Sequence, residues 1–268
     1  VALQYRDGTL EKAISRKGSD VTSKIIKVES LEAAELVKLA NNTFRDLSFA
    51  YSNELALKCS KYNLNAFSLI SAANDGYPRN QIPLPSPGVG GTCLTKDPIL
   101  YSSNLNGIVN RTLGTYGRNV NNKAGAYVLK ILSRYSRKNK ILISKMKILI
   151  VGIAFKGEPA NYDIRNSVPL EVTAKIRDKC KKLYLWDATI KAKHGLIKNL
   201  IADKDLKKIA NSSDAILILN NNRENIRITE LISGNKKQLI FDGWNLFDQS
   251  EIEKNQNLSY STMGYLGD

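Results

Sequence analysis

Leucine, alanine and aromatic side chains recur three or four positions apart between residues 30 and 62, and no glycine or proline interrupts them. This spacing is that of an amphipathic helix. Ser30 is placed to cap its N-terminus, and Glu32 and Glu35 put negative charge into the first turns, where the helix dipole favours it. The pattern predicts one long helix that begins at Ser30.

Shorter helical patterns follow. We predict helices near 66–75 and over 117–139, and a helix that begins at Asp97 with Pro98 in its first turn. The stretch 77–91 between them carries several prolines and glycines and is predicted to be irregular. Residues 1–27 are polar and poorly patterned, and we interpret them as a remnant of another domain followed by a linker.

From Lys147 onward the period of the pattern changes. Short apolar runs predict strands at 147–153, 182–186, 215–219 and, as the last strand, 238–241, with helices at 168–181 and 206–210 between them. Strands that alternate with helices favour a parallel sheet covered on both faces, so the fold class is α/β. Ligands of such sheets bind beyond the carboxyl ends of the strands, where Lys156 and Arg165 follow the first strand.

Composition narrows the function classes. The chain has 268 residues and a formal net charge of +15. Its lysines are scattered, without interleaved aromatic residues or a DNA-reading motif, so we favour a lysine-rich surface over nucleic-acid binding. No apolar run approaches the roughly 20 residues of a membrane span. Cys59, Cys93 and Cys180 form no close pair or metal cluster, which favours a reducing cytoplasm and no metal site.

The only histidine, His194, lies in a polar stretch. We interpret it as a solvated residue, so the chemistry of this chain is expected to proceed without histidine.

One segment carries candidate chemistry. In Pro87–Pro98 three glycines lead to Cys93, and Lys96 and Asp97 follow within four residues. A thiol becomes a nucleophile where nearby positive charge favours its thiolate, and a carboxylate can direct water or a proton. A glycine turn with a small buried cysteine explains the same spacing, which by itself leaves both readings open.

Three ordered segments resemble the UDP-glucose/GDP-mannose dehydrogenase family, the nucleotide-sugar 6-dehydrogenases. Around Cys93 the chain is similar to the family's Gly-x-Gly-Gly-x-Cys-x-x-x-Asp loop. Residues 34–44 resemble its central-helix motif, and residues 152–167 the opening of its C-terminal domain. A weaker similarity is present at 241–245.

The resemblance implies a domain organisation. Residues 28–140 are expected to form an all-helical central dimerisation domain with the catalytic cysteine loop, and 141–268 a Rossmann-like UDP-sugar-binding domain. The family's N-terminal NAD domain has a Gly-x-Gly-x-x-Gly turn, which no segment before residue 28 contains. We therefore expect that domain to be cut away or encoded elsewhere, and residues 1–27 to be its remnant and linker.

The resemblance also implies a reaction. Family members oxidise the C6 alcohol of a UDP-sugar to the acid with two molecules of NAD. Cys93 matches the nucleophile that captures the aldehyde, and Asp97 the aspartate that handles water or protons. Lys38 matches a lysine that stabilises developing oxyanion charge, with Asn42 as its amide partner. The spacing of four puts these last two side chains on one helix face.

Substrate contacts are implied at further positions. The glycines of the cysteine loop are expected to meet the sugar through their backbone; they are Gly88, Gly90 and Gly91. Phe155 and Lys156 are expected to meet the nucleotide-sugar. Arg79 matches an arginine that often reaches the substrate across a subunit boundary, although a surface arginine is an equal alternative.

One cofactor contact is implied as well. Arg165 resembles the arginine with which the family's C-terminal domain contacts the NAD phosphates. A guanidinium fork suits phosphate oxygens. Arg165 could instead pair with Asp163 within its loop.

Two features refine the expected function. Trp244 stands where relatives commonly have an arginine that meets the substrate. The form Pro87–Gly91 favours relatives that act on UDP-N-acetylhexosamines over those that act on UDP-glucose.

We expect a cytoplasmic homodimer that pairs through the long helix, without membrane or nucleic-acid partners. The alternatives are an inert UDP-sugar-binding and dimerisation module and a basic nucleic-acid-binding protein.

Overall fold

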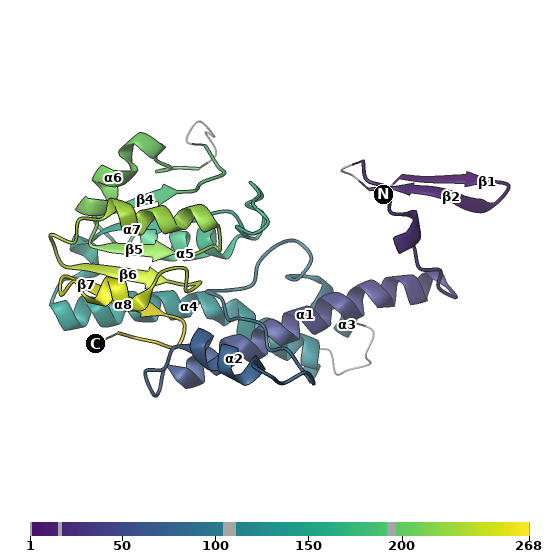
Figure 1. The fold of residues 1–268 in the computed structure, drawn as a ribbon, viewed down its shortest axis with the longest axis horizontal. Helices are drawn as coiled ribbons and strands as arrows, with labels where there is room; N and C mark the ends of the chain where they lie inside the picture. Colours follow the sequence, from purple (N-terminus) through teal and green to yellow (C-terminus); the bar gives the residue numbers. More distant parts are fainter. Residues whose placement is uncertain (1, 16–17, 104–110, 192–196, 268) are drawn as a thin grey trace. The chain divides into compact units, whose positions relative to one another are not determined.

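The computed structural model describes residues 2–15, 18–103, 111–191 and 197–267 (Figure 1). These residues fall into two compact units, Val1–Leu39 and Ala40–Asp268. Helix α1 (Leu31–Cys59) begins in the first unit and continues in the second. His194 lies outside the described residues.

The first unit contains a hairpin that the sequence analysis did not predict. Strands β1 (Ala2–Arg6) and β2 (Thr9–Ile14) pair antiparallel, and a short 3-10 helix, η1 (Thr22–Lys24), follows. Asp7 and Gly8 both have positive φ, 49° and 77°. Asp-Gly in this conformation is the strongest short-range hairpin signal, which the interpretation of residues 1–27 as a domain remnant and linker did not include.

The predicted helices are present. Helix α1 starts one residue after Ser30, whose hydroxyl accepts a hydrogen bond from the backbone N–H of Ala33 at 3.2 Å. Helices α2 (Ala66–Asn74), α3 (Asp97–Ser102) and α4 (Leu113–Asn139) follow. Helix α4 begins four residues earlier than expected because Thr112 caps it: the Thr112 hydroxyl accepts from the backbone N–H of Thr115.

The second unit contains a five-stranded parallel sheet in the order β4-β3-β5-β6-β7. The strands are β3 (Lys147–Val151), β4 (Lys182–Trp186), β5 (Ala215–Ile218), β6 (Gln238–Asp242) and β7 (Leu258–Thr262). The expectation that 238–241 is the last strand was wrong, because β7 pairs with β6 over five residues. Its alternating polar residues, in place of an apolar run, concealed it.

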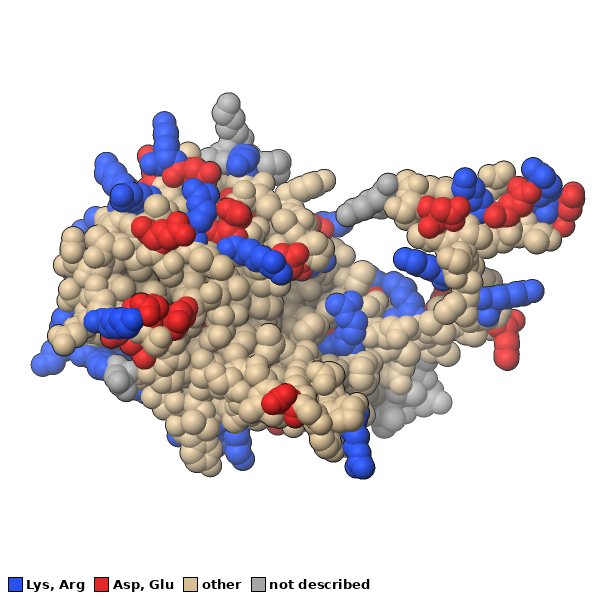
Figure 2. Space-filling model, in the orientation of Figure 1, with Lys and Arg blue, Asp and Glu red and all other residues tan. Residues whose placement is uncertain are grey.

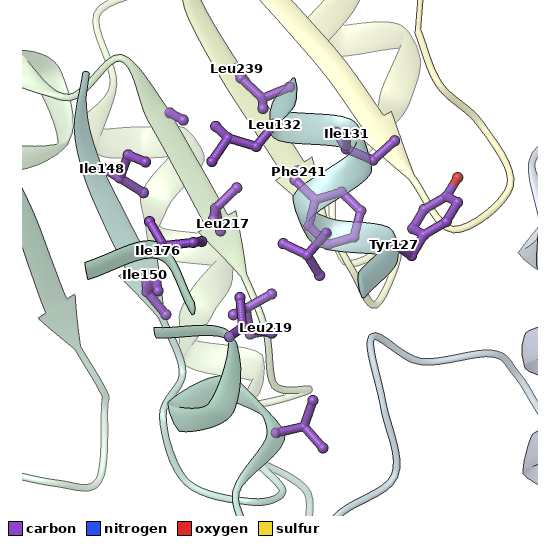
Figure 3. Close-up of a cluster of buried hydrophobic side chains, with 14 of the residues drawn as sticks. Tyr127, Ile131, Leu132, Ile148, Ile150, Ile176, Leu217, Leu219, Leu239 and Phe241 are labelled. Carbon is purple, nitrogen blue, oxygen red and sulfur yellow. The ribbon is translucent and has the colours of Figure 1, made fainter. Parts of the chain in front are cut away.

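Helices cover both faces of this sheet, so the α/β prediction is confirmed. Helices α4 and α5 (Val168–Arg177) pack on one face. Helices α6 (Asp203–Ser212), α7 (Arg227–Leu231) and α8 (Gln249–Glu253) pack on the other, and the short 3-10 helices η3 (Ile143–Lys145) and η4 (Arg223–Ile226) lie in connections. Strand residues alternate between the faces. Ile148 and Ile150 join the first core (Figure 3). Leu149 and Val151 join the second.

The core on the α4 face also includes residues of α1 and α2. Ala56, Phe67 and Tyr127 belong to the same buried cluster as Ile148 and Phe241. The Tyr127 and Phe241 rings lie 6.3 Å apart. Within the second unit, the helices that precede residue 140 therefore bury their apolar side chains against the sheet that follows it.

Candidate functional site

Asn42 on α1 and Asp97 at the start of α3 lie in hydrogen-bond contact. The Asn42 amide donates to Asp97 Oδ2 at 2.6 Å, and Lys96 Nζ lies 2.7 Å from Asp97 Oδ1. Asp97 is fully buried, so these donors compensate its lost hydration. The structure thus brings together two residues, one from each of two separate motifs.

Cys93 is joined to Asp97 through the backbone. The Cys93 carbonyl accepts the N–H of Asp97 at 2.9 Å and that of Lys96 at 3.2 Å, which sets the thiol one turn before the carboxylate. Cys93 is in no disulfide, and the residue is exposed. The alternative of a small buried cysteine is therefore wrong for Cys93.

Two basic side chains lie near the Cys93 thiol. Lys96 and Arg165 both lie within electrostatic reach of Cys93, and the hydrogen bond to Asp97 followed by the nearby charges raises the pKa of Lys96. Cations close to a cysteine stabilise its thiolate, which is the form that attacks carbon. Both cations are also paired with carboxylates, Lys96 with Asp97 and Arg165 with Asp163.

The glycine loop lies against the segment that follows β3. The N–H of Gly91 donates to the carbonyl of Asn166 at 3.1 Å, and the Asn166 amide donates to the Thr95 hydroxyl at 3.1 Å. Gly91 has φ of +89°, and a Cβ there would lie 3.0 Å from the Phe155 ring. At Gly90 a Cβ would lie 2.3 Å from the Asn166 carbonyl oxygen. Gly90 and Gly91 thus permit close backbone packing; their expected contacts with a sugar stay a prediction.

Gly88, the first glycine of the loop, packs against the start of α5. Its φ is +153°, and a Cβ there would lie 2.5 Å from Val168 Cγ1, so a larger residue would meet this side chain. The Gly88 carbonyl accepts a hydrogen bond from the Ser86 hydroxyl at 3.1 Å. These contacts give Gly88 a packing role within the protein, whereas its expected backbone contact with the sugar stays a prediction.

Lys156 and Arg165 follow β3, as predicted. Lys156 Nζ lies 5.8 Å from the centroid of the Phe155 ring, and both side chains are half-buried. Arg165 pairs with Asp163 at 2.6 Å, as the alternative reading predicted, and this hydrogen bond lowers the pKa of Asp163 to about 2. The Arg165 side chain is otherwise exposed, so the pair does not exclude a phosphate contact.

The turn after β3 differs from a dinucleotide-binding turn. The backbone N–H groups of Ile153 and Ala154 donate to Oδ2 of the buried Asp187, at 2.7 and 3.0 Å. Gly152 has φ of +82°, and a Cβ there would lie 2.2 Å from Asn220 Oδ1. Because these N–H groups already bond a carboxylate, they cannot cradle a pyrophosphate. The sequence departs from the Gly-x-Gly-x-x-Gly fingerprint here at the second glycine, where Ala154 stands, whereas Gly157 occupies the third position.

Arg79 and Lys38 are both exposed. Arg79 lies in the segment after α2, where Asn74 holds the backbone of Ile82 through two hydrogen bonds of 2.9 Å. Lys38 lies on the part of α1 that belongs to the first unit, one turn before Asn42. The roles of both residues stay predictions.

The Trp244 segment reaches the glycine loop. A Cβ on Gly243 would lie 2.3 Å from the Pro87 side chain. The backbone N–H of Trp244 donates to Asp242 Oδ1 at 3.2 Å, whereas its buried indole N–H has no acceptor among the described residues. Burial raises the pKa of Asp242 to about 6. The hydrogen bonds that Asp242 accepts from Phe247, Trp244 and Tyr260 act in the opposite direction but are outweighed.

Sequence reasoning missed two residues of this region. Asp46 and Arg118 form a buried ion pair, with 2.8 Å between Oδ1 and Nη1. A signal was present for Asp46, which continues the spacing of four from Lys38 and Asn42. Arg118 had no such signal, because a lone arginine on a predicted helix is usually exposed.

The described residues were compared with two further kinds of feature, metal-binding clusters and membrane-spanning helices. Among these residues no cluster of three or more histidine, cysteine, aspartate or glutamate side chains could hold a metal ion. No helix in the described ranges combines the length and the apolarity that crossing a membrane requires. Figure 2 shows basic and acidic side chains interspersed over the visible face of the second unit, without a continuous basic stripe.

The comparisons with known proteins agree on one class, the nucleotide-sugar dehydrogenases. The description "UDP-glucose/GDP-mannose dehydrogenase family, central domain" matches residues 32–123. Residues 32–123 are thus similar to the central domain of this family.

Individual relatives support the same assignment. A UDP-N-acetyl-D-mannosamine dehydrogenase of Pyrococcus horikoshii is 29% identical over 252 residues, which are 89% of this chain and 56% of the relative. An NDP-N-acetyl-D-galactosaminuronic acid dehydrogenase of Ralstonia nicotianae is 36% identical over 148 residues, 54% of this chain and 32% of the relative. The chain spans about half the length of the curated relatives that it matches along most of its own length.

A solved structure extends the likeness to the fold. A UDP-D-ManNAc dehydrogenase from Pyrococcus horikoshii superposes with a TM-score of 0.69 at 31% identity, covering 87% of this chain and 52% of that one. The similarity therefore spans both the helices before residue 140 and the parallel sheet.

Proposed function

We propose that this chain is the catalytic and sugar-nucleotide-binding portion of an enzyme that oxidises the C6 alcohol of a UDP-sugar to the acid, with NAD as the electron acceptor. The observation that carries the proposal is the convergence of Asn42, Asp97 and Cys93. Asn42 comes from the central-helix motif and the other two from the cysteine loop. The contact between them agrees with the roles that the resemblance gives them.

Each residue has a defined part in the reaction. The Cys93 sulfur forms a bond to the aldehyde carbon as the C=O π bond breaks, and the thiol proton passes to the oxygen. Lys38 and Asn42 stabilise the negative charge that develops on that oxygen before the proton reaches it. After the second oxidation, Asp97 directs water to the thioester; the C–S bond breaks, the acid leaves and Cys93 regains its proton.

NAD would supply the hydride acceptor for both oxidations. Of this chain's described residues, Arg165 fits a phosphate contact, because its guanidinium is exposed and only part of its donor set is used by Asp163. The turn after β3 does not fit, since Asp187 holds its N–H groups. Nothing in this turn supports binding the NAD pyrophosphate there.

The substrate is proposed to be a UDP-N-acetylhexosamine. The named relatives act on N-acetylated sugars according to their names, and the form of the glycine loop favours the same class. Lys156 lies beyond the carboxyl end of β3, where parallel sheets bind their ligands, and its ammonium suits a phosphate oxygen.

Two copies are proposed to pair through α1 and α4. Phe44 and Tyr51 on α1 and Leu113 and Tyr116 on α4 are all more than half exposed. A groove between the helices is lined by Leu47, Tyr51, Leu113 and Tyr116 together with their neighbours. Exposed apolar side chains that cluster in this way are typical of protein interfaces.

Calorimetric titration of this chain tests the proposal. UDP-N-acetylmannosamine and UDP should bind, and Lys156→Ala should weaken both by roughly tenfold, the value of one charge-assisted hydrogen bond. Lys147→Ala is the matched control, because Lys147 lies at the opposite end of β3. Equal affinities for the two variants would contradict the assigned substrate site.

A further inference from the structure

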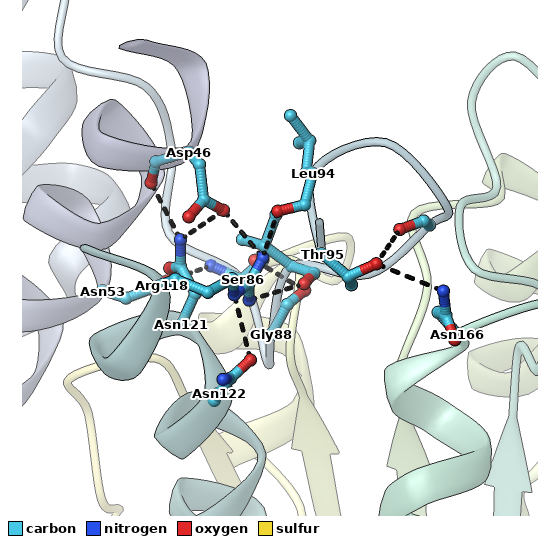
Figure 4. A network of polar contacts seen from close by, with 12 residues as sticks. Asp46, Asn53, Ser86, Gly88, Leu94, Thr95, Arg118, Asn121, Asn122 and Asn166 are labelled. Carbon is cyan, nitrogen blue, oxygen red and sulfur yellow. Dashed lines mark hydrogen bonds and ion pairs between the residues drawn. The ribbon is translucent and has the colours of Figure 1, made fainter. Parts of the chain in front are cut away.

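Arg118 is a buried arginine at the centre of a polar network that the reaction described above does not use (Figure 4). It lies on α4, and its side chain is 3% exposed. Oδ1 of Asp46, on α1, accepts a hydrogen bond from Arg118 Nη1 at 2.8 Å. The Asn121 amide donates to the same oxygen, also at 2.8 Å. Burial lowers the pKa of Arg118, and Asp46 opposes this shift. The ion pair makes the buried charge tolerable.

The guanidinium also binds the backbone on both sides of Cys93. Nη2 donates to the Val89 carbonyl at 2.9 Å, and Nη1 donates to the Leu94 carbonyl at 3.0 Å. Val89 lies between Gly88 and Gly90, and Leu94 directly follows the cysteine. One rigid group therefore holds both ends of the segment that carries the thiol.

Asn122 completes the hydrogen bonding by accepting from Arg118 Nε at 2.9 Å. The planar Arg118 guanidinium thus donates hydrogen bonds to four acceptors: a carboxylate, a side-chain amide and two backbone carbonyls. A lysine has three donors on a single flexible nitrogen and cannot reproduce this geometry.

The far side of the loop is held by another element. Asn166 accepts from the Gly91 N–H and donates to the Thr95 hydroxyl. The loop is therefore attached to α4 on one side and to the segment before α5 on the other, while the Cys93 side chain stays exposed.

We propose that Arg118 is a positioning residue that fixes the Cys93 sulfur for its addition to the aldehyde carbon, an inference that rests on the proposed function. Addition requires the reacting atoms to be about 3–3.5 Å apart and aligned, and a misplacement of about 1 Å can lower the rate about 100-fold. Gly88, Gly90 and Gly91 leave the loop with little stiffness of its own, so its position depends on its attachments, of which Arg118 supplies the one on the α4 side.

The first test measures the loop without relying on activity. In this chain, Arg118→Lys should accelerate hydrogen exchange at the Lys96 and Asp97 amides, which bond the Cys93 carbonyl, by about tenfold or more. Amides of β3 and β5 should keep their protection. Arg134→Lys is the matched control, since Arg134 also lies on α4 and donates to a carbonyl, that of Gly267. Unchanged exchange in the loop would overturn the proposal.

The second test measures turnover in the complete enzyme that contains this chain. Arg118→Lys should lower kcat for acid formation about 100-fold while KM for the UDP-sugar stays within about threefold, because the sulfur moves and the nucleotide contacts do not. A residue that only stabilised the fold would leave kcat per folded molecule unchanged, and that result would refute the positioning role.

A milder variant covers the case in which Arg118→Lys does not fold. Asn122→Ala removes one acceptor from an exposed position and keeps the ion pair. It should accelerate loop exchange about threefold; no acceleration would count against the proposal. If the complete enzyme forms no acid even without substitutions, the proposed function fails, whereas the exchange experiment still decides whether Arg118 holds the loop.

Discussion

The Asn42 amide nitrogen lies 2.6 Å from Oδ2 of Asp97, although 55 positions separate the two residues in the chain. This hydrogen bond fixes the central part of α1 to the start of α3. Asp97 in turn donates its backbone N–H to the Cys93 carbonyl. The amide, the carboxylate and the thiol segment thus form one connected unit, whose parts can be changed separately.

Removal of the Asn42 amide should cost stability. Asn42→Ala takes a donor from the fully buried Asp97 carboxylate, so we expect the free energy of unfolding to fall by about 1–3 kcal/mol. Urea unfolding measures this loss. Asn41→Ala changes an exposed neighbour on the same helix and should leave the unfolding midpoint nearly unchanged.

Replacement of the thiol should separate binding from chemistry. In the complete enzyme, Cys93→Ser should retain the affinity for the UDP-sugar and abolish acid formation, because a hydroxyl is a much weaker nucleophile than a thiolate. Product analysis checks this expectation. Cys180→Ser, at the amino end of β4, should behave as the unmodified protein does. Acid formation at the original rate in Cys93→Ser would exclude the cysteine mechanism.

The oxyanion role of Lys38 has a kinetic signature. Lys38→Ala should lower kcat far more than it raises KM, because stabilisation of developing charge matters only in the transition state. Steady-state kinetics of the complete enzyme with the UDP-sugar measures both quantities. Equal effects on kcat and on binding would indicate a ground-state contact with the substrate instead.

Asp242 should give the stability a specific pH dependence. Burial raises its pKa to about 6, above the usual 3.8, so the folded state binds a proton more tightly than the unfolded state. Protonated Asp242 therefore adds about 3 kcal/mol to the free energy of unfolding. This stabilisation is fully present below about pH 4 and is lost as the pH rises through 6.

Urea unfolding at pH 4 and pH 7 tests this linkage. Between these values the free energy of unfolding of the unmodified chain should decrease relative to that of Asp242→Asn, whose side chain does not titrate. Parallel pH profiles for the two proteins would show that Asp242 keeps an ordinary pKa.

The proposed pairing surface predicts a change of oligomeric state. Tyr116→Glu places a charge beside the groove between α1 and α4 and should convert a dimer to a monomer in light scattering. Tyr162→Glu, at a residue that is 80% exposed in the loop after β3, should leave the mass unchanged. A monomeric unmodified chain would contradict the proposed interface.

The sequence predicted the elements whose hydrophobic period is unbroken. Helix α1 and strand β4 were located to within a few residues, because burial on one helix face or in a sheet centre leaves a clear pattern. Strand β7 was missed since serines alternate with its apolar residues. The hairpin of the first unit was missed because polar residues are frequent in both of its strands.

The site was predictable only in part. The motif residues were located by resemblance, and the contact between Asn42 and Asp97 agrees with their expected convergence. Arg118 could not be predicted, because the burial of a charged side chain depends on acceptors brought from α1 and from both ends of the cysteine loop. Such partners meet only in the folded chain.

The hydrophobic cluster that α1, α2 and α4 share with the sheet limits how this part of the molecule can move. Phe67, Tyr127 and Phe241 lie in one continuous core, so the helices before residue 140 and the strands after it cannot swing apart without exposing that core to water. We expect residues 40–268 to melt in one cooperative transition. The distance between the thiol loop and the segment after β3 is then a fixed dimension of the site, unaffected by any hinge.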